Sequence, residues 1–216
     1  MLFQYFNINE IDDIVVDKYY PMLSDKRKSV ISSMSSGHDR AVALCCEMLA
    51  RKLLCRLLDA PEFSFDLLLQ PNGRSAVGNY KAFLSLASYG DLVACAVSET
   101  NVGLCLTQKR GFSFGEAQSR FSDAELRYIY ADAGFAFVEL MRMSLCNEQT
   151  AVSRFAQYAS IKTAYNRCRG RMAGESGVEI IRTVDGVSLS DPIFQIAVSG
   201  DLEQTSYAIV LKNNKK

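Results

Sequence analysis

Apolar residues gather most densely between Phe83 and Arg110, and their spacing predicts three consecutive strands. Leu84–Leu86 and Leu92–Val97 are rich in β-forming residues and are separated by a Tyr-Gly-Asp turn. Val102–Leu106 follows after a second turn. Because these runs are apolar on both faces, we expect a meander in the interior of a domain, covered by helices. The residues that leave the third strand are polar at once, as at functional strand ends in α/β proteins.

Two segments have the spacing of long helices. Asp39–Asp59 carries an apolar stripe that recurs every three to four residues. Asn147–Arg169 is the second, and its end is crowded with cations without an intervening acid. Such cations are favourable near a helix C-terminus because of the helix dipole, but they could equally bind an anion, so both readings stay open. The stripe comprises Val42, Cys46, Leu49, Leu53 and Leu57, and the cations are Lys162, Arg167, Arg169 and Arg171.

The remaining pattern predicts shorter elements. Ser122 and Glu125 have the spacing of a capping box at the start of a helix. We expect short helices at Asn9–Tyr20, Phe114–Arg120, Asp123–Tyr130 and Ala133–Leu145, and strands at Met1–Ile8, Phe63–Gln70, Gly177–Val184, Ile193–Val198 and Ser206–Leu211.

The order of these elements is strand, helices, strands, helices, strands, which predicts an α+β fold. We expect two related halves, about residues 1–98 and 99–216, each with a long helix packed on a small sheet. No linker of low complexity separates the halves, so residues 1–216 are predicted to form a single unit.

Composition narrows the class of protein. The 216 residues include 24 basic and 24 acidic side chains, and this balance argues against a nucleic-acid binder. No run approaches the roughly 20 apolar residues of a membrane span. The seven cysteines are odd in number and lack a CxxC pair, which indicates reduced core cysteines. With no basic leader before the first apolar stretch, we expect a cytoplasmic protein.

Candidate chemistry is sparse. His38 is the only histidine, and next to Ser36 and Gly37 it is expected to be an exposed neighbour of a helix cap rather than a catalytic base. Ser24 precedes three consecutive cations, Lys26-Arg27-Lys28. These cations are interpreted either as a solvated first helical turn or as a phosphate-binding arm.

Several short motifs then occur in a fixed order along almost the whole chain. They are the basic arm Lys26-Arg27-Lys28, Arg40 at the helix start, Ala50-Arg51, the turn Gly73-Arg74-Ser75, the run Leu84–Gly90 with its strand, Val102-Gly103-Leu104-Cys105-Leu106-Thr107, Arg120-Phe121-Ser122-Asp123-Ala124-Glu125, and the helix segment Ala159–Arg167 with Gly170. Together they resemble the 4'-phosphopantetheinyl transferases of the surfactin-synthetase-activating type.

The resemblance implies a 4'-phosphopantetheinyl transferase-like fold with two pseudo-symmetric halves. It also implies holo-acyl-carrier-protein synthase activity, in which phosphopantetheine moves from coenzyme A to a serine of an acyl or peptidyl carrier protein with the help of Mg²⁺. Positions that would contact coenzyme A or its phosphates follow from the motifs, and Ser88 stands where the family has a histidine. They are Arg27, Arg40, Arg74, Ser88, Lys162 and Arg167.

The departures from the family motifs fall at the reacting centre. Where the family holds Mg²⁺ with carboxylates, this chain has Cys105, Thr107 and Thr163, and Thr163 also replaces the family's proposed base. Mg²⁺ prefers hard, charged oxygen ligands, so we expect no metal and assign no catalytic residue.

The expectation is a degenerate member that binds coenzyme A or a carrier protein, with impaired or lost transfer. One alternative is an active transferase whose unorthodox Mg²⁺ site uses Glu99, Glu116 or the phosphates themselves. The other is a non-enzymatic partner or assembly protein that keeps only the fold.

Overall fold

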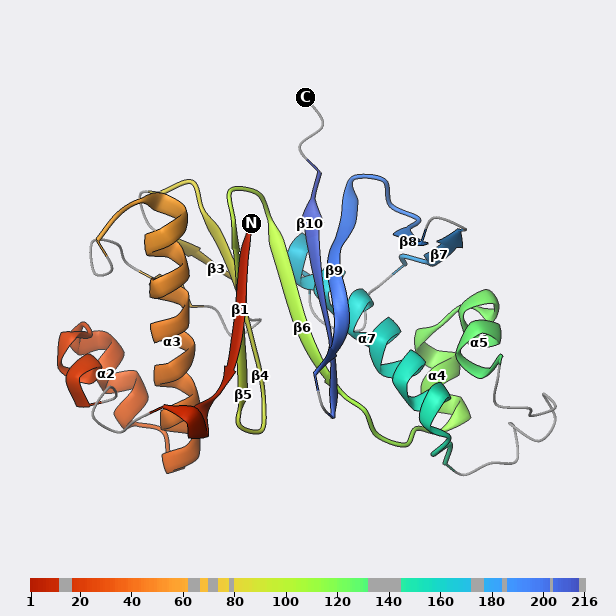
Figure 1. The fold of residues 1–216 in the computed structure, drawn as a ribbon, viewed down its shortest axis with the longest axis horizontal. Helices are drawn as coiled ribbons and strands as arrows, with labels where there is room; N and C mark the ends of the chain where they lie inside the picture. The colour runs from red at the N-terminus through yellow and green to blue at the C-terminus, as the bar shows by residue number, and fades with distance from the viewer. Residues whose placement is uncertain are drawn as a thin grey trace. The chain divides into compact units, whose positions relative to one another are not determined.

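The computed structural model describes residues 1–11, 17–61, 67–69, 74–77, 80–131, 145–171, 177–183, 186–202 and 204–213. The chain divides into two compact units, Met1–Val102 and Gly103–Lys216. Each unit combines a small antiparallel sheet with one long helix (Figure 1). The predicted α+β class is therefore confirmed. No helix in the described ranges has the length and apolarity needed to cross a membrane.

The first unit is a five-stranded sheet with a long helix on it. The strands are arranged in the order β1-β5-β4-β3-β2, and their bounds are β1 Leu2–Asn7, β2 Leu67–Leu69, β3 Arg74–Val77, β4 Phe83–Tyr89 and β5 Leu92–Ser98. The other elements are the 3₁₀ turns η1 Ile8–Glu10 and η2 Tyr20–Met22 and the helices α2 Asp25–Ser32 and α3 Gly37–Leu58.

Helix α3 forms as its sequence predicts. The Ser36 hydroxyl accepts a hydrogen bond from the Asp39 N–H, which caps the first turn. Asp59 ends the helix in the left-handed conformation, with φ 49°. The predicted stripe packs on the sheet, where Leu49 and Leu53 are buried against a cluster that includes Val93, Cys95 and Val97 of β5. Burial of this stripe is what ties the helix to the sheet.

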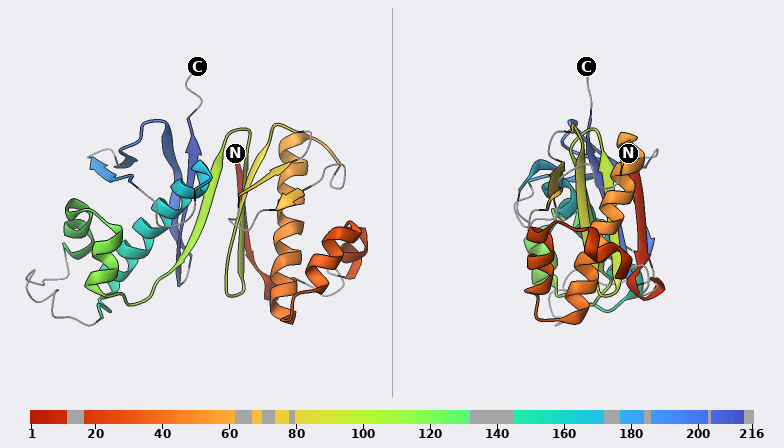
Figure 2. Two further views of the ribbon diagram at one scale, coloured as in Figure 1. Left: turned by 180° about the vertical axis from the view of Figure 1, so that it is seen from behind. Right: turned by 90° about the vertical axis from the view of Figure 1, so that its left-hand side faces the viewer.

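The second unit has a three-stranded sheet in the order β6-β10-β9, covered by α7, and a separate two-stranded sheet (Figure 2). The strands are β6 Val102–Gln108, β7 Ile180–Thr183, β8 Gly186–Leu189, β9 Phe194–Leu202 and β10 Thr205–Lys212, and the helices are α4 Phe114–Arg120, α5 Asp123–Tyr130 and α7 Gln149–Arg169. The predicted capping box of α5 is confirmed in both of its hydrogen bonds.

The predicted three-stranded meander is wrong. Strands β4 and β5 do pair, but β6 pairs with β10 in the other sheet. A strand that is apolar on both faces can pair with either of two apolar strands. The sequence of such a strand does not show whether its partner is a strand about five residues away or one about a hundred residues away. Strands β3 and β8 were also not predicted.

Four predicted elements fall partly outside the described residues; of the strand expected at Gly177–Val184, only residue 184 lies outside. Of the helix expected at Asn9–Tyr20, the described part begins with the 3₁₀ turn η1, and residues 12–16 lie outside the description. Residues 132–144, most of the helix expected at Ala133–Leu145, also lie outside it. The strand expected at Phe63–Gln70 is described only as β2, and the turn at 71–73 is not described.

Candidate functional site

The basic arm lies on α2, and its central cation is held by an acid. Ser24 caps α2, and the Arg27 guanidinium forms an ion pair with Glu47 of α3. The same carboxylate binds Arg51 at 3.0 Å (Nη2 to Oε1). Glu47 and Arg51 are almost fully buried, whereas Arg27 keeps 20% of its side chain exposed. Arg27 therefore acts first as part of a buried charge network that fastens α2 to α3.

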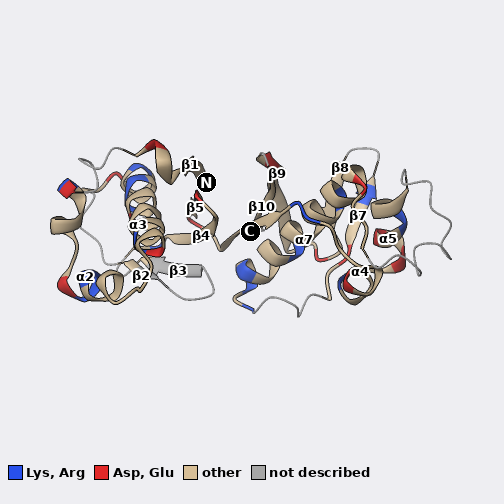
Figure 3. Cartoon of the chain, turned by 90° about the horizontal axis from the view of Figure 1, so that it is seen from below, with Lys and Arg blue, Asp and Glu red and all other residues tan. Residues whose placement is uncertain are grey.

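The other candidate positions of the first unit are less engaged. Arg40 is exposed at the end of the first turn of α3, and within the described ranges no side-chain partner of Arg40 is found. Ser88 is exposed near the end of β4. Arg74 begins β3 in register with Ser85 of β4, and its side chain lies outside the description. Both basic and acidic residues occur on α2 and α3 (Figure 3).

The single histidine takes part in a clasp between three elements. His38 Nε2 donates to Asp91 Oδ1 at 2.8 Å, and Asn9 Nδ2 donates to the other carboxylate oxygen at 2.9 Å. The Ile8 N–H donates to the Asp91 carbonyl at 2.8 Å. Asp91 at the β4–β5 turn thus holds both η1 and the start of α3. As predicted, His38 is exposed near the helix cap, with 47% of its side chain accessible.

This clasp predicts a dependence of stability on acid. The hydrogen bond from His38, followed by that from Asn9, lowers the pKa of Asp91 below its usual value. A lowered pKa contributes stability above the unfolded value of about 3.9, and the contribution is lost as pH falls through the folded value. We expect Asp91→Asn to lower the free energy of unfolding near neutral pH and to match the wild type in strong acid, as measured by urea titration across pH.

Asp25→Asn is the matched control for the clasp, because the Asp25 carboxylate is fully exposed and lies 3.8 Å from the Lys28 ammonium. The effect of Asp91→Asn on the free energy of unfolding is compared with that of Asp25→Asn at each pH. A constant effect of Asp91→Asn at every pH would contradict the clasp.

In the second unit, β6 and α7 lie directly against each other at the positions that resemble the family metal site. Gly103 of β6 faces the backbone of α7 at Ala164, and Arg167 donates to the Leu104 carbonyl at 2.6 Å. The predicted ligand positions are therefore on two adjoining elements: Cys105 and Thr107 on β6, and Thr163 on α7.

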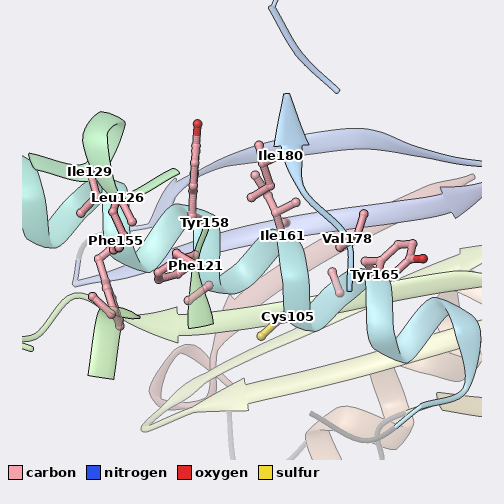
Figure 4. Packing of buried hydrophobic residues seen from close by; sticks show 14 of the residues in the cluster. Cys105, Phe121, Leu126, Ile129, Phe155, Tyr158, Ile161, Tyr165, Val178 and Ile180 are labelled. Atoms are coloured by element: carbon pink, nitrogen blue, oxygen red, sulfur yellow. The ribbon is translucent and has the colours of Figure 1, made fainter. Parts of the chain in front are cut away.

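The donors at these positions do not suit Mg²⁺. Cys105 is 5% exposed, and Figure 4 shows its sulfur beside α7 within the apolar cluster that includes Ile161 and Tyr165. Its Sγ lies 3.6 Å from the Thr107 hydroxyl oxygen. A thiol and two hydroxyls offer no charged oxygen to a hard cation. Within the described residues, no three His, Cys, Asp or Glu side chains gather in a way that could hold a metal ion.

Lys162 is buried and paired with an acid. Its Nζ lies 2.7 Å from Glu125 Oε2 and donates to the Arg120 carbonyl at 3.0 Å. The ammonium also lies 5.1 Å from the centre of the Phe121 ring. Glu125 further accepts from the Ile180 N–H at 2.8 Å. The pair thus joins two segments that resemble separate family motifs, and it neutralises a cation predicted to bind phosphate.

One cation at the end of α7, Arg169, also contacts an acid that is distant in sequence. Arg169 Nη1 lies 2.6 Å from the Tyr165 hydroxyl and 3.9 Å from Asp191 Oδ2, and the Tyr165 hydroxyl donates to the same carboxylate at 2.7 Å. Burial raises the pKa of Tyr165, so the phenol stays protonated as a donor. These contacts favour a structural role for Arg169. Of the pairing acids, only Glu47 had a sequence signal, its four-residue spacing from Arg51.

The cysteines behave as core residues. All seven are free, and five of them are buried. Burial raises the pKa of Cys45 to about 11 and that of Cys46 to about 12. Thiols with such values are protonated at neutral pH and are poor nucleophiles. The prediction of core cysteines is therefore confirmed for the five buried ones.

Compared with models of known protein families, the chain matches none, and no curated protein matches it either. A functional assignment for this chain therefore rests on its motifs and on the contacts described above.

Proposed function

We propose that this protein is a relative of the 4'-phosphopantetheinyl transferases that binds coenzyme A or a carrier protein but does not carry out Mg²⁺-assisted transfer. The supporting observation is the contact between β6 and α7, which puts the three family ligand positions on adjoining elements without a carboxylate among them. The proposal includes the finer fold of the family, with two pseudo-symmetric halves.

The chemistry of the reaction explains why these replacements matter. A serine hydroxyl that attacks a phosphate of coenzyme A needs a base, and the developing negative charge needs a cation to stabilise it. Thr163 has no basic group near neutral pH, and Cys105 is packed among apolar side chains. The positions at which the family has its base and its metal ligands therefore supply neither a base nor a cation site in this chain.

Binding of coenzyme A requires fewer protein groups than transfer of phosphopantetheine does. Some of the residues predicted to bind its phosphates are accessible. Arg40 and Ser88 are exposed, while Arg27 keeps a partly exposed guanidinium beside its acid. A phosphate is a good partner for an exposed arginine because the planar guanidinium binds it in a bidentate way. We therefore place coenzyme A recognition chiefly at Arg40.

A second candidate function is favoured by the ion pairs. Arg27 and Lys162 are already neutralised by Glu47 and Glu125, which suits a partner or assembly protein that keeps the fold without a ligand. The remaining alternative, an active transferase with other Mg²⁺ ligands, is less favoured because Glu116 is bound to Arg110 at 2.8 Å.

Isothermal titration calorimetry with coenzyme A distinguishes the first two candidates. We expect a dissociation constant of about 10–100 μM, raised about tenfold by Arg40→Ala, which corresponds to about 1.4 kcal/mol. Arg56→Ala is the matched control, since Arg56 is an exposed arginine at the other end of the same helix. If titration of the wild type with coenzyme A releases no heat of binding, the partner or assembly protein becomes the better-supported function.

Mass spectrometry of an apo carrier protein incubated with this protein, Mg²⁺ and coenzyme A tests the lost transfer. We expect the carrier mass to stay unchanged. A gain of one phosphopantetheine would refute the loss of chemistry and restore the active transferase.

A further inference from the structure

Strand β1 forms one edge of the five-stranded sheet and has an unusual composition for an edge. Its six residues, Leu-Phe-Gln-Tyr-Phe-Asn, include no charge, proline or glycine. Its pairing with β5 runs from Leu2 to Asn7 without a register shift. Proteins usually protect such edges with charges, prolines, bulges or short strands, because unpaired backbone groups recruit another strand.

The other edges of the two larger sheets are short, charged and interrupted, or buried. Strand β2 has only three residues. Strand β9 carries Asp201, and its pairing with β10 is interrupted at Ile209/Val210. The first four residues of β6 are buried, whereas none of the six residues of β1 is. Among the described strands of the two larger sheets, β1 is thus the long, uncharged, regular and accessible edge.

The register identifies which backbone groups of β1 face outwards. The Ile8 N–H donates to the Asp91 carbonyl, in the position that continues the β1–β5 register. Hydrogen-bonded and non-hydrogen-bonded pairs alternate in an antiparallel ladder, so Phe6 and Gln4 direct their N–H and C=O groups to β5. The corresponding groups of Tyr5, between them, point to the open edge.

The side chains on one face of β1 anchor the strand, and those on the other face include an exposed aromatic residue. Leu2 and Phe6 pack on the apolar cluster beneath α3, which anchors the strand. On the other side, Tyr5 is 45% exposed and pairs with the Phe3 ring at a centroid distance of 6.0 Å. An anchored strand with an exposed aromatic at its centre can accept a partner strand without rearranging.

We propose that β1 pairs in an antiparallel manner with β1 of a second copy of this chain, about a two-fold axis at Tyr5. A two-fold axis at Tyr5 brings Tyr5 opposite its own copy, so a charged residue at this position would repel itself. The uncharged sequence of β1 meets this requirement. At the axis, the two Tyr5 residues exchange N–H to C=O hydrogen bonds, and their rings become cross-strand neighbours.

Sedimentation velocity from about 5 to 500 μM tests this surface. A single strand pair buries less than the roughly 1,200 Å² of a standard interface, so we expect a dimer with a dissociation constant of about 10–100 μM. Tyr5→Pro removes the outward N–H but no β5 hydrogen bond, and should raise the dissociation constant at least tenfold while the fold is retained. A wild type that stays monomeric at every concentration overturns the proposal.

A charge pair tests the two-fold axis itself. Tyr5→Lys and Tyr5→Glu each keep the backbone donor, yet each should be monomeric, because like charges would face each other across the axis. An equimolar mixture of the two variants should form a heterodimer. If the single variants dimerise as well as the wild type, or if the mixture stays monomeric while both variants fold, the pairing at Tyr5 is wrong. Circular dichroism of each variant establishes folding.

Discussion

Replacing Gly103 by alanine is expected to destabilise the second unit by about 3 kcal/mol or more, the upper range for overpacking a core. A Cβ at this position would lie 1.9 Å from the Ala164 carbonyl oxygen and 2.5 Å from the Cys168 amide nitrogen. Both are backbone atoms of α7, so no side-chain rotation relieves the clash. The helix would have to move away from β6, with loss of the hydrogen bond between Arg167 and the Leu104 carbonyl.

Gly115→Ala is the matched control for this prediction. Gly115 lies in α4, and a Cβ there would meet nothing within 4 Å. Alanine in a helix is favoured over glycine by roughly 0.5–1 kcal/mol, so this variant should be slightly stabilised. Urea unfolding followed by circular dichroism measures both effects. Equal stability of Gly103→Ala and the wild type would show that α7 and β6 are not in backbone contact.

This contact also illustrates what sequence patterns could predict. A glycine in an apolar strand is a known sign that another backbone segment approaches closely. The sequence of the strand does not identify that segment. Local features were predictable: the period of α3, and the three-residue spacing of Ser122 and Glu125 in the capping box. These signals depend on neighbours within one or two helical turns.

Pairing across long distances was not predictable in the same way. Strand β6 was assigned to the wrong sheet because its apolar sequence does not specify a partner. The candidate cations were selected as if they were free, yet the partner of Lys162 is 37 residues away and Asp191 lies 22 residues beyond Arg169. An unpaired basic run in sequence is therefore weak evidence for an anion site until the acids of neighbouring elements are placed.

The second large effect is expected at Glu125 and Lys162. Glu125 accepts hydrogen bonds from Lys162, from the Ser122 N–H at 2.8 Å and from the Ile180 N–H, and both side chains are more than nine-tenths buried. Removing one partner of such a pair leaves an uncompensated charge in the interior, which costs about 3–5 kcal/mol. We expect this loss for Lys162→Met and a similar one for Glu125→Gln in urea unfolding.

The double variant Glu125→Gln with Lys162→Met separates pairing from packing. It leaves no isolated charge, so its cost should be less than the sum of the single costs by at least about 2 kcal/mol. The exposed pair of Arg110 and Glu116 provides the matched cycle, with an expected coupling of about 0.2–1 kcal/mol. Additive costs at Glu125 and Lys162 would contradict a buried ion pair.

The same variants decide between the structural and the phosphate-binding role of Lys162. A lysine that contacts phosphate can be replaced with loss of ligand affinity and little loss of stability, because its charge is solvated in the free protein. Replacement of a lysine that is paired with Glu125 instead lowers stability and has little effect on ligand affinity. We therefore expect Lys162→Met to lower the free energy of unfolding while the folded variant binds coenzyme A within about twofold of the wild type, a difference of about 0.4 kcal/mol. A tenfold loss of affinity for coenzyme A in Lys162→Met, with an unchanged free energy of unfolding, would show that Lys162 binds the ligand.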